Sequence, residues 1–579
     1  MLNSKLTKGV KRDPSLPKGR QTDDLSEKEI KELVGNLHFD RSQLIEALHL
    51  IQDKFNCLSQ RHLKSLSELF KLSQAEVFEV ASFYHHFDIV KDGESLDHEL
   101  TIRICDGLSC EMAGAQHLIK NVKEIIDENK IRIQKVPCIG RCANAPAAQV
   151  GKKAVNNATP LKLLKFSKDD TAPEIPDYQN LSDYLNIGGY ECLKKVISKK
   201  LNLKNAISIL AKSGLRGLGG AGFPADKKWQ IVNSYNGIRY MTINGDEGEP
   251  GTFKDRFWLE SEPHKMLEGA QIAALLVGCN KIYLYMRDEY PAVLEILKAE
   301  IEKLEKTNFW LVPIEIRRGA GAYICGEESA MIESIEGKRG LPRHRPPYIA
   351  EKGLFGRPTL NHNIETLFWI PEILSKGSEW FAGLGFNENH KGVRSYSVSG
   401  RVLNPGVKVA PAGIPVRKLI DDYCGGMLPG HEFKAFFPGG ASGGIFPAKM
   451  SDMGLDFGIF EPHGGFVGSH AVIILSDQDS ILDAVINTIK FFKHESCGQC
   501  TPCREGTGWM WRMMDRLVRG QAEPHEIDTL YEITKQVEGH TICALGDAAA
   551  WPIQGLIKNF RPEIERRIQI NKTVTEAAE

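Results

Sequence analysis

Eight of the thirteen cysteines in this chain form two groups of four, one toward each end. Thiolates are the ligands that zinc sites and iron–sulfur clusters use in proteins, so each group is a candidate metal centre. Two such centres on one chain indicate electron transfer. The front group comprises Cys105, Cys110, Cys138 and Cys142, and the rear group comprises Cys497, Cys500, Cys503 and Cys543.

The spacing of both groups favours iron–sulfur clusters. Four residues separate Cys105 from Cys110 and three separate Cys138 from Cys142, whereas paired zinc ligands more often have a two-residue gap. The rear group has three thiolates within seven residues, which suits one face of a cubane cluster, with Cys543 delivered from a distant loop. Zinc, and for the front group plain buried thiols, remain alternatives on spacing alone.

A glycine-rich run, Gly217–Gly222, predicts a loop whose backbone a ligand can approach closely. The run matches the G-x-G-x-x-G fingerprint, but an amphipathic helical pattern precedes it where that fingerprint requires a strand. Lys228 follows a few residues later and is positioned to neutralise a phosphate.

An acidic run, Asn244–Gly251, directly follows a predicted strand. Its carboxylates, Asp246, Glu247 and Glu249, would repel phosphate but suit hydrogen bonds from ribityl or ribose hydroxyls. A divalent-metal loop and a solvated acidic turn are the alternatives. The run therefore favours a nucleotide-like cofactor between the two cysteine groups.

Composition agrees with a globular protein of several domains. The chain has 579 residues, 42% of them hydrophobic and 25% charged, and its net charge of −1 argues against binding to nucleic acid or an anionic membrane. The longest apolar runs, such as Ile272–Val277, are far shorter than the roughly 20 residues of a membrane span. We expect a soluble, cytoplasmic protein with reduced or ligated cysteines.

The hydrophobic period divides the chain into successive units. Helical spacing before residue 88 includes apparent capping boxes at Ser26/Glu29 and Ser73/Glu76, and alternating strands with one helix follow from Leu100 to Val150. Residues 156–182 have the composition of a linker. Beyond it the pattern indicates α/β layers, a β-rich insert and a helical tail.

The front part of the chain resembles the 24-kDa subunit of respiratory NADH dehydrogenases. The resemblance covers roughly residues 25–150 and depends on the spacing of the front cysteines and on the segment Ala81–Phe87. It implies a thioredoxin-like domain that binds a [2Fe–2S] cluster.

Residues 190–575 resemble the 51-kDa flavoprotein subunit of the same enzymes. The hallmarks are Gly214–Trp229, Asp246–Arg256, Tyr323–Glu328 and the rear cysteine segment with its [4Fe–4S] pattern. The resemblance implies FMN in an α/β domain, with NAD(H) stacked on it and orientated by Glu249 and Glu328. The implied FMN contacts are Gly217, Gly219, Lys228, Asn244, Asp246, Glu247, Tyr323, Gly326, Glu327, Asn363, Thr366, Ala544 and Leu545, and the implied NAD contacts are Phe223, Glu249, Glu328 and Tyr348.

Four positions depart from the family pattern. Leu218 and His362 stand where Arg and Asn are common, and Arg345 and Tyr348 replace Lys and Phe near the adenine site. The last two substitutions keep charge or aromaticity, so we expect them to affect nucleotide affinity more than chemistry.

Together the resemblances imply a multidomain α/β protein. Its parts are a helical bundle, a thioredoxin-like [2Fe–2S] domain, a Rossmann-like FMN- and NAD-binding domain, a β-grasp-like domain and a C-terminal helical bundle with [4Fe–4S]. The predicted boundaries are 1–23 for a flexible tail, then 24–97, 98–180, 181–392, 393–478 and 479–579 for these five domains.

The fusion of both subunit types resembles the flavin-containing diaphorase subunit of soluble NAD-reducing [NiFe] hydrogenases. It implies hydride exchange between NAD(H) and FMN, followed by single-electron transfer through the clusters to or from an iron–sulfur subunit and a hydrogenase module. The flavin subunit of an NAD-dependent formate dehydrogenase is the alternative enzyme. Outside the enzymes, an iron–sulfur scaffold without catalysis and a zinc-stabilised interaction protein are the alternatives.

Overall fold

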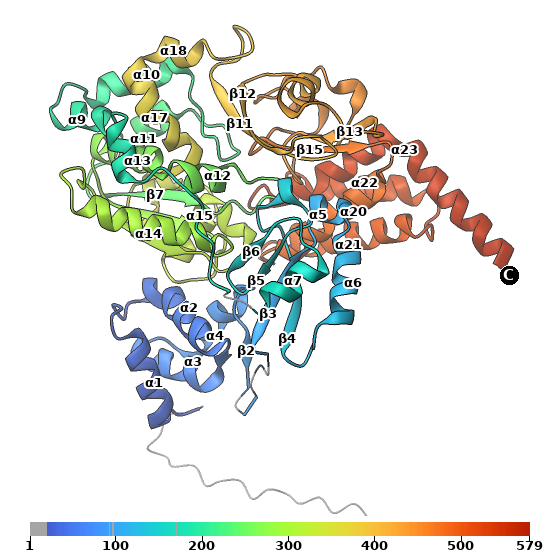
Figure 1. The fold of residues 1–579 in the computed structure, drawn as a ribbon, viewed down its shortest axis with the longest axis horizontal. Coiled ribbons are helices and arrows are strands. Elements are labelled where there is room, and N and C mark those ends of the chain that lie inside the picture. Colours follow the sequence, from blue (N-terminus) through green and yellow to red (C-terminus); the bar gives the residue numbers. More distant parts are fainter. Residues whose placement is uncertain (1–19, 92, 95, 97, 169–170, 579) are drawn as a thin grey trace, which may run out of the picture. The chain divides into compact units, whose positions relative to one another are not determined.

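The structure is a computed structural model, and it describes residues 20–578 apart from positions 92, 95, 97, 169 and 170 (Figure 1). It consists of two compact units, one ending at residue 96 and one from residue 97 onward. The predicted tail, residues 1–23, lies outside the described residues except for its last four. The boundaries predicted for the individual domains stay predictions.

The first unit is a helical bundle. Its helices are α1 (Asp24–Val34), α2 (Leu44–Phe55), α3 (Gln60–Leu69) and α4 (Gln74–Phe83), and two short strands, β1 (Leu58–Ser59) and β2 (Ile89–Val90), pair in parallel. The capping box at Ser73 and Glu76 is confirmed. The one predicted at Ser26 is wrong, because Asp23 caps α1 and the Ser26 hydroxyl instead contacts Ser65 Oγ at 2.8 Å.

The second unit begins with a small four-stranded sheet. Strand β3 (Leu100–Cys105) pairs in parallel with β4 (Ile131–Val136) and antiparallel with β5 (Ala148–Val150), which pairs with β6 (Lys153–Val155). Helices α5 (Leu108–Met112) and α6 (Ala115–Ile125) follow β3. Of the front cysteines, Cys105 ends β3 and Cys110 lies within α5, while Cys138 and Cys142 lie in the segment after β4, where backbone can wrap a cluster.

The segment predicted as a linker contains structure. Helix α7 (Pro160–Phe166) starts behind the cap residue Thr159 and buries Leu163 with Ile102, Val122 and Val150 in the core of the small sheet. Residues 156–182 are mostly polar, so the single buried face of α7 could not be predicted from composition.

A parallel sheet forms the centre of the next part of the second unit. Its strand order is β10 (Thr359–Asn363), β7 (Arg239–Gly245), β8 (Cys279–Met286) and β9 (Ile314–Arg318). Helices α13 (Pro263–Val277) and α17 (Ile364–Lys376) pack against each other beside it, within one large apolar core. Ligands bind such sheets at the carboxyl ends of the strands.

Further helices surround this sheet. They are α8 (Leu181–Asn186), α9 (Glu191–Ile197), α10 (Leu203–Ser213), α11 (Ala225–Ser234), α12 (Lys254–Ser261), α14 (Pro291–Glu305), α15 (Glu328–Ile335), α16 (Ile349–Lys352) and α18 (Ser378–Ala382). Helix α10, not a strand, precedes the glycine-rich run, as its amphipathic pattern predicts.

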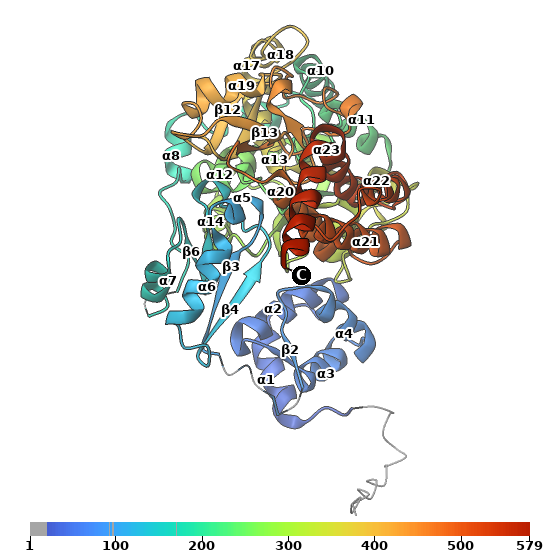
Figure 2. The ribbon, with the colours of Figure 1, turned by 90° about the vertical axis from the view of Figure 1, so that its right-hand side faces the viewer.

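A second sheet follows, with strand order β12 (Gly406–Pro411), β11 (Val393–Gly400), β15 (Ala471–Ser476), β13 (Phe433–Phe437) and β14 (Phe446–Pro447). A short helix, α19 (Val416–Lys418), lies between its strands in the sequence. The remaining helices, α20 (Ile481–Glu495), α21 (Thr501–Val518), α22 (Glu526–Val537) and α23 (Leu545–Ala578), pack side by side in a bundle (Figures 1 and 2). Within the described residues, no helix combines the length and apolar character that crossing a membrane requires.

Candidate functional site

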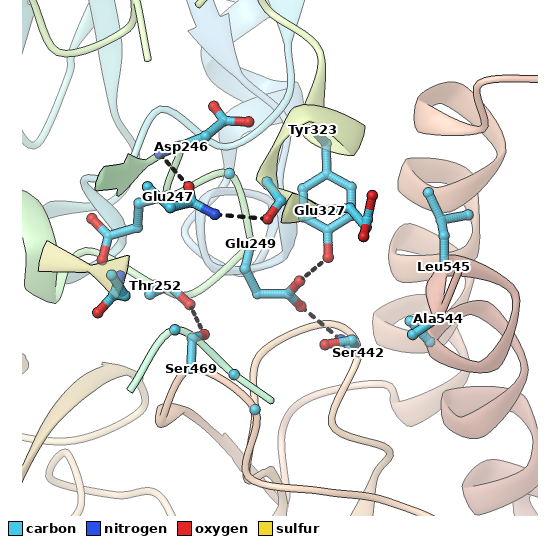
Figure 3. Close-up of a pocket in the computed structure, with 18 of the residues that line it drawn as sticks. Asp246, Glu247, Glu249, Thr252, Tyr323, Glu327, Ser442, Ser469, Ala544 and Leu545 are labelled. Carbon is cyan, nitrogen blue, oxygen red and sulfur yellow. Dashed lines mark hydrogen bonds between the residues drawn. The ribbon is translucent and has the colours of Figure 1, made fainter. Parts of the chain in front are cut away.

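A cavity of about 250 Å³ opens at the carboxyl ends of β7 and β10 (Figure 3). Its walls come from the glycine-rich loop, the acidic loop with the start of α12, the turn before α15, the end of β10, loops of the second sheet and the start of the last helix of the bundle. The lining residues are Gly219, Gly220, Asn244, Asp246, Glu247, Gly248, Glu249, Thr252, Lys254, Asp255, Tyr323, Ile324, Gly326, Glu327, Asn363, Ser442, Phe466, Gly468, Ser469, Cys543, Ala544, Leu545 and Ala548.

The acidic loop is fixed at its start by hydrogen bonds from Asn244. The Asn244 side-chain amide donates to Gly326 O at 2.8 Å, and its oxygen accepts from the Asp246 N–H at 3.0 Å. Asp246 Oδ2 is buried and has no hydrogen-bond partner in the described structure. Burial raises the pKa of Asp246 well above its usual range. An unpaired buried carboxyl oxygen on a cavity wall fits a ligand that brings a hydrogen-bonding group, such as a hydroxyl or a ring nitrogen.

Glu247 anchors the loop rather than offering free acceptors. Its carboxylate accepts hydrogen bonds from the Asp255 N–H at 2.8 Å, the Arg256 N–H at 3.1 Å and the Tyr290 hydroxyl at 3.0 Å. Burial raises the pKa of Glu247 to about 7. Three donors on one carboxylate hold the chain that forms the floor of the cavity.

Glu249 connects two walls of the cavity. The Tyr323 hydroxyl donates to one carboxylate oxygen, and the Ser442 N–H donates to the other at 2.8 Å (Figure 3). Burial raises the pKa of Glu249 to about 7, against the hydrogen bonds from Tyr323 and Ser442, which lower it. The carboxyl group can therefore hold or release a proton near neutral pH.

Lys254 places a buried positive charge on the cavity wall. Its ammonium lies 2.8 Å from Asp255 Oδ1, 3.0 Å from Glu365 Oε2 and 3.3 Å from Asn363 Oδ1. Burial lowers the pKa of Lys254, but the carboxylates of Asp255 and Glu365 outweigh that effect and raise it above its ordinary value. The lysine therefore stays charged, and it balances the acids around it.

The glycine-rich loop reaches the cavity through Gly219 and Gly220. Its turn is held by hydrogen bonds from Gly217 N–H to Phe223 O at 2.8 Å and from Leu218 N–H to Thr366 Oγ1 at 2.9 Å. A Cβ at Gly219 would come within 2.9 Å of the Asn363 Cβ, so only glycine fits there. The Leu218 side chain is fully buried in the core, which accounts for an apolar residue at this position.

Eleven predicted contact residues line the cavity and six do not. Those in the wall are Gly219, Asn244, Asp246, Glu247, Glu249, Tyr323, Gly326, Glu327, Asn363, Ala544 and Leu545. Those outside it are Gly217, Phe223, Lys228, Glu328, Tyr348 and Thr366. All seventeen assignments to a cofactor stay predictions.

The six residues outside the wall have other surroundings. Gly217 and Thr366 hold the glycine loop, and the half-buried Lys228 donates from its ammonium to Asn361 O at 3.0 Å. Glu328 lies 3.6 Å from Arg345, which also pairs with Glu327. The residue exposures of Phe223 and Tyr348 are 42% and 58%, which leaves both rings free to stack on a planar ligand.

The sequence did not point to several wall residues. Ser442, Phe466, Gly468 and Ser469 come from loops of the second sheet, about two hundred residues beyond the acidic loop. Lys254 lies inside the run Asp246–Arg256, and the adjacent Asp255 is the one feature of the sequence that could have indicated a buried ion pair.

The rear cysteines adjoin the cavity. Cys543 lines it, followed directly by Ala544 and Leu545 at the start of α23. Burial raises the pKa of Cys543 to about 12, and the charges of Cys497 and Cys503 act in the same direction, so these thiols lie near one another. Cys500 is the N-cap of α21, and Cys503 Sγ lies 3.2 Å from Ser496 Oγ. Four converging thiols fit a cubane cluster beside the cavity.

The front cysteines form a compact set. All four are buried free thiols, and Cys138 Sγ lies 3.3 Å from Cys142 Sγ, too far for a disulfide. Hydrogen bonding to Cys110 and Cys138 raises the pKa of Cys105 above its usual range, so Cys105 and Cys110 belong to the same set as Cys138 and Cys142. The Gly140 N–H points to Cys138 Sγ at 3.4 Å, the kind of contact that tunes a cluster.

Comparison with known proteins agrees with this arrangement. Three family models match successive parts of the chain: "Thioredoxin-like [2Fe-2S] ferredoxin" over residues 30–168, "Nuo51 FMN-binding domain" over 210–372, and "NADH-ubiquinone oxidoreductase-F iron-sulfur binding region" over 483–567. These matches overrule the zinc alternatives for both cysteine groups.

Individual relatives cover somewhat less than two thirds of the chain. The F subunit of NADH-quinone oxidoreductase from Rhodobacter capsulatus is 48% identical over 375 residues, which is 62% of this chain and 86% of the relative. The mitochondrial NADH dehydrogenase [ubiquinone] flavoprotein 1 of Dictyostelium discoideum is 47% identical over 377 residues, 62% of this chain and 78% of the relative.

A solved structure matches almost the whole chain. A chain of the NAD+-reducing [NiFe]-hydrogenase in its H2-reduced state aligns with a TM-score of 0.81 and 28% identity, over 92% of this chain and 94% of that one. The air-oxidized state aligns with a TM-score of 0.79.

The fold and the site define an NADH-dependent flavin and iron–sulfur oxidoreductase, with FMN, one [2Fe–2S] cluster and one [4Fe–4S] cluster as its cofactors. The chain belongs to the family of NADH-quinone oxidoreductase F subunits, and it also carries the thioredoxin-like [2Fe–2S] domain on the same polypeptide.

Proposed function

We propose that this chain is the NAD(H)-reactive subunit of a hydrogenase complex. In it the chain would exchange electrons with an iron–sulfur subunit and a [NiFe] module, and H2 would drive NAD+ reduction. The observation that carries the proposal is the extent of the structural match: 92% of this chain against 62% for the NADH-quinone oxidoreductase relative from Rhodobacter capsulatus. The front domain thus shares its place in the polypeptide with the hydrogenase chain.

The cavity residues support the NAD(H) chemistry. FMN, when bound, takes up an electron pair with hydrogen from NADH and releases electrons singly to a cluster. We propose that Asn244, Asp246 and Gly326 hold the flavin, with Gly219 and Asn363 closing around it. Phe223 and Tyr348, both exposed, would stack on the nucleotide, and Glu328 would orientate it.

Glu249 is the proposed orientating acid of the site. Its carboxyl group is held from two sides by Tyr323 and Ser442, so its direction is fixed. A carboxyl whose pKa is about 7 changes charge near neutral pH, so it can hold or release a proton at Oε1 or Oε2 as charge beside it changes.

The contact between the rear centre and the cavity supports electron transfer between the flavin and the rear cluster. Cys543 is a proposed cluster ligand, and it shares the cavity wall with Ala544 and Leu545. Tyr323 is also tied to the helix that leads into Cys497, because its N–H donates to Glu495 Oε2 at 2.9 Å. No intervening domain separates this wall from the rear thiols within the described residues.

Metal analysis of the intact complex tests the partner. The tagged chain is purified anaerobically from its own host, and its co-purifying subunits are assayed for nickel, molybdenum and tungsten. Nickel together with H2-dependent NAD+ reduction is the expected result. Molybdenum or tungsten would indicate the formate dehydrogenase alternative, and co-purification with membrane quinone-reducing subunits would contradict the proposal. A cytoplasmic location is part of the proposal, and activity confined to the membrane fraction would contradict that part.

A further inference from the structure

The ligand loop of the front centre packs directly against the acidic loop of the flavin cavity. Cys138 and Cys142 form a buried apolar cluster with Phe253, which lies in the run Asp246–Arg256. The two cofactor sites therefore share a wall, although more than one hundred residues separate them in the sequence.

Arg287 lies in that wall, immediately after the end of β8. Its Nη2 donates to Cys138 O at 2.7 Å, and its Nη1 donates to Glu247 O. The side chain is 4% exposed, so its charge is shielded little by solvent. One guanidinium thus contacts both a cluster-ligand residue and the loop that floors the flavin cavity.

Two further contacts fix the same wall. Arg256 Nε donates to Gly140 O at 2.9 Å, and a Cβ at Gly140 would come within 2.0 Å of the Tyr290 hydroxyl. That hydroxyl is the one that donates to Glu247, and the Tyr290 ring also lies 4.8 Å from the Arg287 guanidinium. The guanidinium is therefore held in one position from several sides.

Glu289 is the carboxylate partner of Arg287. Glu289 Oε1 lies 3.1 Å from Nη2, Glu289 Oε2 accepts from Nε at 3.3 Å, and the Glu289 side chain is 17% exposed against 4% for Arg287. The guanidinium also donates to neutral carbonyls at Cys138 and Glu247, so its positive charge lies directly against the cysteine loop.

We propose that Arg287 is a positioning residue that sets the reduction potential of the [2Fe–2S] centre. Each electron that the centre takes up adds one negative charge, and a fixed cation in a buried site stabilises that charge. Arg287 would thereby keep the front centre reducible at the potentials available beside the flavin. The proposal depends on the cofactors of the chain and not on its partner, so it stands or falls independently of the proposed hydrogenase role.

Two substitutions of opposite expected sign test this role. Arg287→Met removes the cation and should lower the midpoint potential of the [2Fe–2S] centre. Glu289→Gln removes the compensating carboxylate and should raise it. A merely structural disturbance of the wall would not reverse sign between the two variants. Arg401→Met is the matched control, because Arg401 Nη2 donates to Met112 O at 2.9 Å, joins the same small domain to the second sheet and is likewise paired with a carboxylate, Asp479 Oδ1, at 2.8 Å.

The measurement is a redox titration of the anaerobically purified holoprotein, with dithionite as the one-electron reductant and both cluster signals followed by electron paramagnetic resonance. At the wild-type midpoint, we expect Arg287→Met to lower the reduced-to-oxidised ratio of the [2Fe–2S] centre at least tenfold, which for one electron corresponds to about 59 mV. The [4Fe–4S] midpoint should stay unchanged in every variant, and Arg401→Met should change neither.

Three results would overturn the proposal. They are an unchanged [2Fe–2S] midpoint in Arg287→Met, a shift of the same sign in both test variants, and an equal shift in Arg401→Met. If Arg287→Met does not assemble the centre, the rise expected in Glu289→Gln decides, and its absence would also overturn the proposal.

Discussion

The Tyr323 hydroxyl donates a hydrogen bond to the Glu249 carboxylate across the cavity, where Glu249 is buried and Tyr323 is half-buried. The two come from different strands of the sheet, since Glu249 follows β7 and Tyr323 follows β9. The pair therefore closes the cavity between two loops that the sequence separates by more than seventy residues.

The first prediction concerns the pH dependence of stability. The pKa of Glu249 in the folded protein is raised to about 7 from 4.5. The folded protein therefore accommodates the protonated acid at low pH, and it loses stability as the pH rises from about 4.5 to about 7 and the buried carboxyl ionises. In flavin-depleted protein, Glu249→Gln should therefore raise the free energy of unfolding at pH 8 relative to wild type, on the order of 3 kcal/mol at most. The gain should shrink toward pH 5.

Tyr323→Phe is the matched variant for this prediction. The Tyr323 hydrogen bond lowers the pKa of Glu249, so its loss should move the transition to higher pH. Urea titrations across pH 5 to 8 measure both effects (roughly the window in which such carboxyls titrate). A stabilisation by Glu249→Gln that is independent of pH would refute this assignment of the raised pKa.

The second prediction concerns Lys254. Lys254→Met leaves the buried carboxylates of Asp255 and Glu365 without their cation, so unfolding should become easier by about 3–5 kcal/mol and flavin should be lost on purification. Lys376→Met is the control, because its pair with Glu372 is exposed and should cost about 1 kcal/mol or less. Chemical denaturation and flavin content are the measurements. Equal stability losses in the two variants would speak against a buried ion pair.

The third prediction concerns Gly140. In Gly140→Ala the new Cβ overlaps the Tyr290 hydroxyl at 2.0 Å, and the backbone is left-handed there, with φ +69°. The [2Fe–2S] signal should be lost while the [4Fe–4S] signal persists. Gly114→Ala has a similar backbone angle, φ +88°, but nothing within 4 Å of the new Cβ, so both signals should remain. Retention of the front cluster in Gly140→Ala would contradict the packing of this loop against Tyr290.

The fourth prediction concerns Cys543. Cys543→Ser removes one ligand of the rear centre, so the [4Fe–4S] signal should disappear and the [2Fe–2S] signal should not change. Because Cys543 lines the cavity, the flavin spectrum should also be perturbed. Cys424→Ser, at a buried thiol of the second sheet, should leave both clusters intact. Iron and acid-labile sulfide assays with electron paramagnetic resonance distinguish these outcomes.

Local patterns in the sequence predicted the elements that position the site. The acidic loop follows a strand because Met241 and Ile243 are core residues of β7, and helix α13 begins at Pro263, where proline is favoured in a first turn. The helical context of the glycine run was predicted because the apolar spacing before Gly217 has the helical period.

Features that depend on tertiary packing were not predictable. Ser442 reaches Glu249 from a loop of another domain, and nothing near Ser442 in the sequence marks it. In the sequence Arg287 is one charged residue after a strand, and its contact with Cys138 depends on the tertiary fold. The position of Glu247, with its carboxylate used by three protein donors, also depends on the return of Tyr290 to the same wall.

Anaerobic addition of NADH to the purified chain tests the central claim most directly, with visible absorbance and electron paramagnetic resonance recorded together. The account predicts bound flavin that bleaches on NADH addition, followed by the signal of a reduced iron–sulfur cluster. Zinc in place of iron, or a flavin that NADH leaves oxidised in a protein with both clusters assembled, would contradict it.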